Sequence, residues 1–427
     1  MGIKKICVIG LGYIGLPTAS LLANNGFEVV GVDKKENLTG IINNGGVHIE
    51  EPGLKALVNA AVNSKLLKAK TEAEEADVFF IAVPTPVKTE GEEVKIDLSY
   101  VEQASQEIAL FLRKGNIVIL ESTSPPGTSL NLVAPILESS GLKAGKDFYL
   151  AHCPERVMPG NTLRELIQNN RVIGGINLES AERAKFLYKQ FVEGEISITN
   201  ATTAEMVKLI ENIYRDVNIA LANELSMICE KAGINVWEAV KLANLHPRVN
   251  VHMPGPGVGG HCISVDPWFI IKSFQEESKV IALSRQINDQ QPEKVVESIK
   301  RILKDINDPV VTIMGVAYKG NIDDTRESPA LKVIDILKEA GINFKIYDPH
   351  VSNFAYDTKS LKEAFEKSDC AVVLADHDEF RFLYPKELAE LMRTKQVFDA
   401  RNCLDRELWE SKGFKYYLLG SGDGGSF

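Results

Sequence analysis

A strand, a glycine-rich turn and a helix follow one another at the start of this chain, and this order restricts the fold more than any other feature. The apolar run 6–9 predicts a buried parallel strand, and the stretch 16–25 predicts a helix that Gly26 ends. Three glycines in a GxGxxG pattern join them: Gly10, Gly12 and Gly15. A strand and a helix joined in this way predict the first unit of a doubly wound α/β sheet.

The same turn predicts a binding site for a dinucleotide. The glycines allow a tight turn, close approach of a pyrophosphate and contact between helix and strand, and the helix N-terminus favours an anion. A second strand is predicted at 28–32, and Asp33 at its end can bind both ribose hydroxyls and repel a 2′-phosphate, which favours NAD over NADP. A tightly packed turn without a ligand is the alternative. The predicted cofactor-binding residues of this segment are Gly10, Gly12, Tyr13, Ile14, Gly15 and Asp33.

Composition is that of a globular enzyme. At 427 residues, with 44% hydrophobic and 25% charged residues, the chain is expected to form two or three domains. Its net charge of −10 argues against a nucleic acid or a membrane surface as partner. No apolar stretch reaches ~18 residues without a charge, so no membrane span is expected, and the N-terminus does not read as a signal peptide.

The cysteines are scattered, without CxxC pairs or the histidine spacing of zinc sites. No metal site is therefore expected. A location in the reducing cytoplasm is expected. Their positions are 7, 153, 229, 262, 370 and 403.

From residue 1 to about 200, predicted strands and helices alternate as in a doubly wound sheet. Beyond the first two, strands are predicted at 78–83, 117–121, 148–152 and 196–198, with helices that include 98–112 and 178–191. Ligand-binding loops follow the carboxyl ends of such strands. The corresponding loops here are 84–86, 122–128 and 154–156.

One long helix is predicted over 202–232, about 45 Å in length. Residues 202–205 are interpreted as its capping box and Gly233 as its stop. A helix of this length suits a joint between two domains or two subunits. Glu205, Lys208 and Asn212 lie on one face of it, because they are spaced i, i+3 and i+7. A simple helix cap with a solvated lysine is the alternative.

A glycine-rich loop around Cys262 interrupts the helices predicted between 233 and about 300. The glycines before the cysteine leave room for a substrate to approach the thiol, and Asp266 follows four residues later. This carboxylate could hold a water, a proton or an ammonium group. A buried, inert cysteine in a tight turn is the alternative.

Alternation resumes at about residue 310. Strands are predicted at 310–315, 344–348, 371–374 and 396–399, and a helix at 329–340. This half has no GxGxxG pattern. It has instead a polar loop, 317–329, suited to a different nucleotide.

Short motifs follow a fixed order along nearly the whole chain. They are GLGYIGLP (10–17), VPTP (83–86), ESTSPPGT (121–128), PER (154–156), EMVKLIEN (205–212), GGHC (259–262) with Asp266, GVAYK (315–319), DDTRESP (323–329) and DARN (399–402). In this order they resemble the UDP-glucose/GDP-mannose dehydrogenase family. The resemblance implies an α/β fold of two Rossmann-like doubly wound domains, joined by a long central helix and a small all-helical dimerisation domain. It also implies a homodimer or larger homo-oligomer.

The domains that the resemblance implies are three. Residues 1–200 would bind NAD, 201–305 would form the central helical region with the cysteine loop, and 306–427 would bind the UDP-sugar.

The family oxidises the C6 alcohol of a sugar nucleotide to a carboxylate with two NAD. Lys208, Asn212 and Asp266 resemble the residues that serve the first hydride transfer, the first two by stabilising oxyanions. Cys262 would then attack the aldehyde, and loss of a second hydride would give a thioester that water hydrolyses. Glu155 resembles the carboxylate of the later proton-transfer steps. The implied catalytic residues are Cys262, Lys208, Asn212, Asp266, Glu155 and Thr123.

The resemblance also implies binding residues. Those that match positions lining the NAD site are Thr85, Thr123 and Arg326. Lys319 and Arg401 match residues near the nucleotide diphosphate, whose charge suits cations. Arg248 matches an arginine that reaches the sugar across a dimer interface. Ordinary surface cations are the alternative for these three. The implied substrate-binding set is Glu155, Arg156, Lys208, Asn212, Arg248, Gly259, Lys319 and Arg401.

The expected substrate follows from departures from the UDP-glucose pattern. That branch has a lysine immediately before the aspartate, where this chain has Val265, and His261 lies in the glycine turn. The run HCISVDPWF (261–269) resembles the branch that oxidises UDP-N-acetyl-D-mannosamine to UDP-N-acetyl-D-mannosaminuronate. UDP-N-acetyl-D-glucosamine is the second expectation and UDP-glucose the third.

Two other interpretations remain open. A β-hydroxyacid dehydrogenase shares a Rossmann domain and a catalytic lysine, but normally lacks the second nucleotide unit after 310 and the cysteine loop. A non-catalytic NAD-binding protein would keep the fold. The joint presence of Lys208, Asn212, Cys262 and Asp266 speaks against it.

Overall fold

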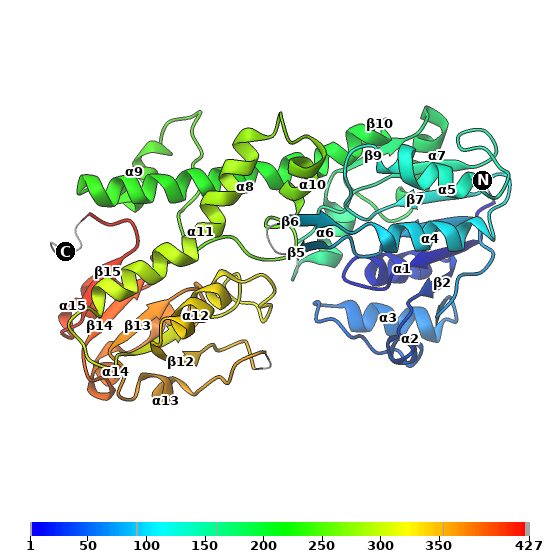
Figure 1. Ribbon diagram of the computed structural model, residues 1–427. Helices are drawn as coiled ribbons and strands as arrows, with labels where there is room; N and C mark the ends of the chain where they lie inside the picture. The colour runs from blue at the N-terminus through cyan, green and yellow to red at the C-terminus, as the bar shows by residue number, and fades with distance from the viewer. Residues whose placement is uncertain (1, 91–92, 159, 353, 423–427) are drawn as a thin grey trace. The chain divides into compact units, whose positions relative to one another are not determined.

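The computed structural model describes residues 2–90, 93–158, 160–352 and 354–422 (Figure 1). The chain forms two compact units. The N-terminal unit comprises residues 1–211 with 268–273, and the C-terminal unit comprises 212–267 with 274–427. The division falls inside the long helix α8, between Glu211 and Asn212.

The N-terminal unit is built on an eight-stranded sheet with the order β10-β9-β8-β7-β4-β1-β2-β3. Its strands are β1 (Lys5–Ile9), β2 (Glu28–Val32), β3 (Leu67–Lys70), β4 (Val78–Ile81), β7 (Ile117–Leu120), β8 (Tyr149–His152), β9 (Arg171–Gly175) and β10 (Ile196–Asn200). All neighbours run parallel except β8 and β9, which pair antiparallel. The last two strands therefore run against the other six.

Both faces of this sheet are buried. In β1, Ile6 and Val8 belong to the hydrophobic cluster on one face, whereas Cys7 and Ile9 belong to the cluster on the other. A continuous apolar strand is what a sheet covered by helices on both sides requires. The other elements of this unit are α1 (Gly15–Asn24), α2 (Glu36–Asn43), α3 (Leu54–Asn63), the hairpin β5 (Val87–Glu90) and β6 (Glu93–Ile96), α4 (Ser99–Ala109), the π-helix η1 (Ser129–Val133), α5 (Ala134–Glu138), α6 (Thr162–Gln168) and α7 (Leu178–Tyr188).

Helix α8 (Ala201–Ala232) runs without interruption for 32 residues, which confirms the long central helix (Figure 1). Its predicted capping box is wrong. The Oδ1 atom of Asn200 accepts a hydrogen bond from the Thr203 backbone N–H at 2.8 Å, so asparagine caps the helix. The Glu205 carboxylate instead accepts from the backbone N–H groups of Gly127 and Ser129.

The C-terminal unit contains a parallel five-stranded sheet with the order β12-β11-β13-β14-β15. Its strands are β11 (Val310–Met314), β12 (Asn343–Tyr347), β13 (Cys370–Val373), β14 (Gln396–Asp399) and β15 (Lys415–Leu418). Its helices are α9 (Val236–Ala243), α11 (Lys279–Ile302), α12 (Pro329–Glu339), α13 (Leu361–Phe365), the 3-10 helix η2 (Asp378–Phe382), α14 (Pro385–Leu391) and α15 (Arg406–Ser411). Helix α10 (Asp266–Ser273) begins in this unit and ends in the other.

The predicted α/β class with two Rossmann-like sheets is confirmed. The predicted strands are present, with ends that shift by one or two residues. Among the strands, the sequence analysis missed β3, β9, β15 and the β5–β6 hairpin.

Candidate active site

The turn after β1 has the backbone that its glycines predict. Gly10 has φ +95°, and a Cβ there would lie 2.4 Å from the Ala82 carbonyl oxygen. A Cβ on Gly15 would lie 1.8 Å from the Gly10 carbonyl oxygen. Gly12 differs, because no heavy atom of the described chain lies within 4 Å of such a Cβ. The protein itself therefore requires the outer two glycines, while the middle one leaves open space for a ligand.

Asp33 ends β2 beside this turn. It is half-buried, and its two oxygens accept hydrogen bonds from the backbone N–H groups of Leu11 at 3.4 Å and Lys35 at 3.0 Å. Each carboxylate oxygen has two lone pairs, so both retain capacity for a ribose hydroxyl. Tyr13 is exposed and Ile14 half-buried at the start of α1. Predicted cofactor residues thus surround the N-terminus of one helix, where a phosphate is stabilised.

Two loops at the carboxyl edge of the sheet are tied together. The Thr85 hydroxyl donates to the Thr123 carbonyl oxygen at 2.7 Å, and the Ser122 hydroxyl donates to the Val83 carbonyl oxygen at 2.7 Å. The structure thus brings the two predicted threonines into contact. Their loops follow β4 and β7, which are neighbours in the sheet.

Glu205 fixes the second of these loops to α8. Its buried carboxylate accepts from Gly127 N at 2.5 Å and from both the backbone N–H and the hydroxyl of Ser129 at 2.7 Å. Lys208 lies one turn further along the helix and is 8% exposed. Within the described residues of its own unit, Lys208 has no ion pair or hydrogen bond. An unpaired, largely buried ammonium is costly in a folded protein, and it favours an anion that arrives or develops beside it.

Glu155 lies beside a buried arginine because β9 runs antiparallel to β8. His152 is opposite Gly174, and continuing this register by three residues places Glu155 opposite Arg171. The Glu155 Oε2 and Arg171 Nη1 atoms are 3.6 Å apart, with both side chains less than 10% exposed. Such a buried pair is only weakly screened by solvent.

A second carboxyl group lies close to the same arginine. The Arg171 guanidinium lies 5.1 Å from the centre of the Tyr188 ring, and the Tyr188 hydroxyl donates to Glu121 Oε1 at 2.6 Å. Burial raises the pKa of Glu121 to about 7. Burial also lowers the pKa of His152 to about 3, so this histidine is neutral. The cluster therefore places two buried carboxyl groups, those of Glu155 and Glu121, near one arginine.

Arg156 is engaged within the N-terminal unit. Its guanidinium forms two hydrogen bonds with the Glu211 carboxylate and donates to the Asn170 carbonyl oxygen at 2.9 Å. Any contact of this side chain with a substrate would add to this ion pair or replace it.

The C-terminal unit joins Asn212 and Asp266, 54 residues apart in the sequence. The Asn212 Nδ2 atom donates to the Asp266 Oδ2 atom, and both residues are buried. The Arg215 Nη2 atom donates to the Asn212 Oδ1 atom. Two predicted catalytic residues are thus in direct contact, and Arg215, which the sequence analysis missed, completes a chain of three. Its i+3 spacing from Asn212 was the available signal.

Cys262 is the exposed one among the six cysteines; the other five are buried. It lies in a turn in which its carbonyl oxygen accepts from Val265 N at 3.1 Å and from Asp266 N at 2.8 Å. The preceding glycines pack on the loop 315–328. A Cβ on Gly259 would lie 2.5 Å from the Glu327 carbonyl oxygen, and Gly260 has φ +84°. The glycines therefore allow the cysteine loop to pack closely on the loop 315–328, while the thiol stays accessible.

The predicted cationic residues of the C-terminal unit lie in three places. Arg326 forms two hydrogen bonds with the Asp324 carboxylate, at 2.8 and 2.6 Å. Arg401 donates to Asp376 Oδ1 at 2.8 Å, and its buried Nε has no hydrogen-bond partner among the described residues. Lys319 and Arg248 are exposed. Arg401 also flanks the segment leading to Cys262, because a Cβ on residue 255 would lie 2.9 Å from its Nη1.

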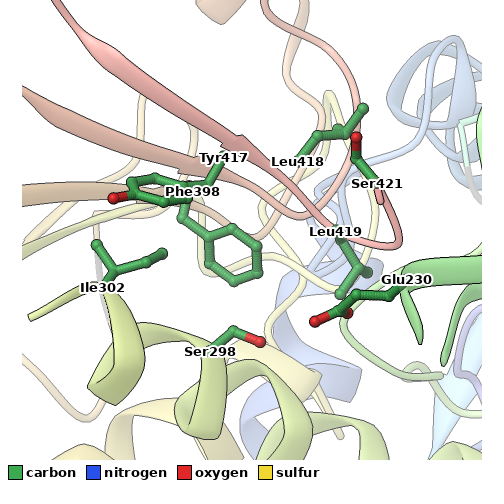
Figure 2. A pocket seen from close by; sticks show the side chains of 8 residues that line it. All are labelled: Glu230, Ser298, Ile302, Phe398, Tyr417, Leu418, Leu419 and Ser421. Atoms are coloured by element: carbon green, nitrogen blue, oxygen red, sulfur yellow. The ribbon is translucent and has the colours of Figure 1, made fainter. Parts of the chain in front are cut away.

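A small hollow lies in the same unit, where α8 and α11 meet β14 and β15 (Figure 2). Glu230 and Ser298 supply polar atoms to its lining, and Arg301 pairs with Glu230 at 3.0 Å. No predicted site residue lines it. It is therefore separate from the candidate active site.

No helix among the described residues is long and apolar enough to cross a membrane. The chain matches three domain descriptions of one family, the UDP-glucose/GDP-mannose dehydrogenase family. They are its NAD binding domain over residues 4–192, its central domain over 202–290 and its UDP binding domain over 312–406.

Individual relatives match over nearly the whole length. The chain is 52% identical over 426 residues to a UDP-N-acetyl-D-mannosamine dehydrogenase of Methanococcus vannielii, covering 98% of each chain. Among solved structures, it is similar to the UDP-D-ManNAc dehydrogenase of Pyrococcus horikoshii, with a TM-score of 0.92, 41% identity and coverage of 98% of this chain and 100% of that one. The UDP-N-acetyl-mannosamine dehydrogenase of Staphylococcus aureus gives a TM-score of 0.90 at 44% identity, covering 98% and 99%.

Proposed function

Because the chain belongs to the UDP-glucose/GDP-mannose dehydrogenase family, we propose that this NAD-dependent oxidoreductase converts UDP-N-acetyl-D-mannosamine to UDP-N-acetyl-D-mannosaminuronate. UDP-N-acetyl-D-glucosamine and UDP-glucose are the alternative substrates, in that order. The observation that carries the four-electron chemistry is the single exposed thiol, Cys262, at the end of a loop that leads directly to Asp266.

The cofactor is NAD, which accepts one hydride in each of the two oxidations. Gly10, Gly12 and Gly15 let its pyrophosphate approach the N-terminus of α1, and the free lone pairs of Asp33 receive the ribose hydroxyls. Tyr13 and Ile14 border the same turn. The Thr85–Thr123 pair and Arg326 contribute further contacts with NAD.

In the first oxidation, the C6 hydroxyl loses its proton and C6 loses a hydride, which gives an aldehyde. Negative charge develops on O6 as the proton leaves. Lys208, with no partner in its own unit, and the Asn212 amide stabilise this charge, and Asp266 accepts the proton through a water or directly.

In the second oxidation, the Cys262 sulfur attacks C6 and forms a thiohemiacetal, so the aldehyde stays bound. Loss of the second hydride to NAD, together with loss of the O6 hydroxyl proton to water, leaves a thioester. Glu155, which lies beside Arg171, takes a proton from the water that attacks this thioester, with Thr123 assisting. The products are the carboxylate and the regenerated thiol, and two NAD are reduced for each sugar.

The substrate is held mainly by cationic groups of the C-terminal region. Lys319 and Arg401 bind the diphosphate, and the Nε of Arg401 offers a donor that no group in the described part of the chain accepts. Arg156 and Gly259 border the sugar, as do Glu155, Lys208 and Asn212. Three regions divide this work: 1–200 for NAD, 201–305 for the helical centre and the cysteine loop, and 306–427 for the UDP-sugar.

The surface of α8 supports the proposal of a homodimer or larger homo-oligomer. Tyr214, Leu221 and Ile228 are 50%, 42% and 55% exposed, and their spacing of seven residues places them on one face. A second copy of the helix would cover this apolar face, and Arg248 would then reach the partner's substrate. A cytoplasmic location suits the five buried, unpaired cysteines.

The test is a comparison of UDP-N-acetyl-D-mannosamine, UDP-N-acetyl-D-glucosamine, UDP-glucose and GDP-mannose as substrates, with NADH measured per sugar. We expect two NADH per molecule, with the highest kcat/KM for the first. Cys262→Ser should stop acid formation, whereas Cys229→Ser is a matched control that keeps it. One NADH per sugar would refute the thioester route, and no NADH from any of the four would refute the function.

A further inference from the structure

Arg215 lies beside the Asn212–Asp266 pair and has no role in the chemistry described above. We propose that Arg215 is a positioning residue, which holds the Asn212 amide in the one orientation that presents its N–H groups to Asp266 and to the reacting O6. This inference rests on the proposed function, because Asn212 is there the group that stabilises the developing oxyanion.

The contacts form a chain of three side chains within the C-terminal unit. Arg215 follows Asn212 by three residues on α8, so the two side chains project from adjacent turns of one face. The Arg215 Nη2 atom donates to Asn212 Oδ1, and Asn212 Nδ2 donates to Asp266 Oδ2. Asn212 is fully buried and Asp266 is 4% exposed.

The donor and acceptor chemistry allows only one arrangement of this chain. An amide is nearly symmetric in shape, so a rotation of 180° exchanges its oxygen and nitrogen without a steric cost. A guanidinium can only donate and an ionised carboxylate can only accept. Arg215 therefore selects the amide oxygen, Asp266 selects the amide nitrogen, and both specify the same orientation.

Loss of Arg215 would leave the buried Asn212 oxygen without a partner. A buried polar atom without a hydrogen bond is unfavourable, so the amide would turn or tilt toward another donor. In either case its N–H groups would leave Asp266 and the position of O6. The proton acceptor and the oxyanion donor would then lose their common alignment, which catalysis by positioned groups requires.

The charge of Arg215 also acts across the amide. It lies on the opposite side of Asn212 from the Asp266 carboxylate, so the amide connects a cation with an anion. Burial lowers the pKa of His252, and the neighbouring Arg215 lowers it further. The charge of Arg215 therefore favours the neutral form of the neighbouring His252.

The test compares Arg215→Met, which removes both donor and charge, with Arg215→Gln, which keeps a donor but not the charge. Arg301→Met is the matched control, because Arg301 pairs with Glu230 elsewhere in the same unit. We expect Arg215→Met to lower kcat by about 10- to 100-fold with KM changed less than about threefold, which is the range for losing part of an oxyanion contact. Arg215→Gln should lie between it and the wild type.

A double-mutant cycle separates positioning from a general structural role. In an Asn212→Ala background, Arg215→Met should change single-turnover NADH formation by less than about twofold, because its effect passes through the missing amide. Equal losses in both backgrounds would overturn the inference. A turnover assay of the wild type tests the proposed function on its own.

A crystal structure of Arg215→Met gives a readout that does not depend on activity. We expect the Asn212 side chain to leave the Asp266 carboxylate or to adopt a different χ angle. An unchanged Asn212 rotamer with the Asp266 contact intact would overturn the inference whatever the enzyme does with any sugar.

Discussion

The two sheets begin with the same turn and put it to different uses. In the N-terminal unit, Gly10 has φ +95° and its N–H donates to the Val32 carbonyl oxygen at 2.8 Å. In the C-terminal unit, Gly315 has φ +84° and its N–H donates to the Tyr347 carbonyl oxygen at 2.9 Å. In both, an aspartate follows the second strand. The backbone of the turn is therefore common to both units.

The two aspartates differ in how many groups they already bind. Asp33 is half-buried and accepts two backbone hydrogen bonds. The Asp348 side chain is fully buried, and it accepts from four backbone N–H groups and from the Nε2 atom of His377 at 3.1 Å. Asn321 N–H donates to His377 Nδ1 at 2.9 Å, so Nε2 carries the proton.

The helix that follows each turn differs in the same sense. Helix α1 begins at Gly15, five residues after Gly10, whereas α12 begins at Pro329, fourteen residues after Gly315. In the first arrangement, the helix N-terminus and a carboxylate with spare lone pairs lie beside the turn. In the second, the helix begins nine residues further along the chain, and the carboxylate already accepts five hydrogen bonds from its own unit.

The largest effect is expected at the glycine that the two turns share. Gly10→Ala and Gly315→Ala should each lower the free energy of unfolding by about 3 kcal/mol or more, because each requires a positive φ and its Cβ would lie 2.4 or 2.6 Å from a neighbouring atom. Urea unfolding would measure this. Gly12→Ala is the control, since open space surrounds that position. A normal stability for Gly315→Ala would show that the two turns are not equivalent.

A smaller loss is expected from Asp348→Asn. An amide nitrogen cannot accept from the groups that now donate to the carboxylate, so stability should fall by about 2–3 kcal/mol at pH 7. Burial opposes ionisation, but His377 and the backbone donors hold the pKa of Asp348 below its usual range. The stability it contributes is therefore present above pH ~4 and lost as pH falls through the lowered pKa. The wild type and the variant should converge in acid, and a constant difference down to pH 2 would contradict this.

Asp33→Asn should affect binding more than stability. We expect the Kd for NAD to rise by about tenfold, equivalent to about 1.4 kcal/mol, because the ribose loses a charged acceptor. Discrimination against NADP should weaken as well. Thermal unfolding without cofactor should change little. A loss of stability as large as that of Asp348→Asn would erase the distinction between the two carboxylates.

The smallest effect is expected from His350→Ala. His350 stacks on His377 at 4.8 Å between ring centres and pairs with Glu379 at 3.1 Å, near the protein surface. An exposed pair of this kind contributes about 0–1 kcal/mol. Chemical unfolding should therefore place this variant within about 1 kcal/mol of the wild type. A larger loss of stability would show that His350 also helps to hold His377 against Asp348.

What the sequence predicted correctly was local. The turn at Gly10, the acidic end of β2 and the length of α8 each depend on neighbouring residues, so spacing alone identified them. The capping box failed because Glu205 had a competing partner, the N–H groups at 127 and 129, which lie more than 70 positions earlier in the chain. Strand β9 was missed because it begins with a buried arginine and ends with two glycines. Its antiparallel direction, which pairs Arg171 with Glu155, has no local signal.

The site shows the same limit. Spacing put Lys208 and Asn212 on one helical face, but it could not show that Asp266 packs against Asn212, or that Arg215 would bind the other end of that amide. Such contacts depend on tertiary packing, where the partner is chosen by proximity and not by sequence distance.

The isolation of Cys262 from the other five cysteines has a practical consequence. Under native conditions a small alkylating reagent such as iodoacetamide is expected to reach one sulfur per chain, because the other five are buried. The mass added to the intact polypeptide then counts the fraction of molecules with an available nucleophile before any nucleotide is supplied. Alkylation of this one thiol therefore measures the concentration of reactive sites in a preparation.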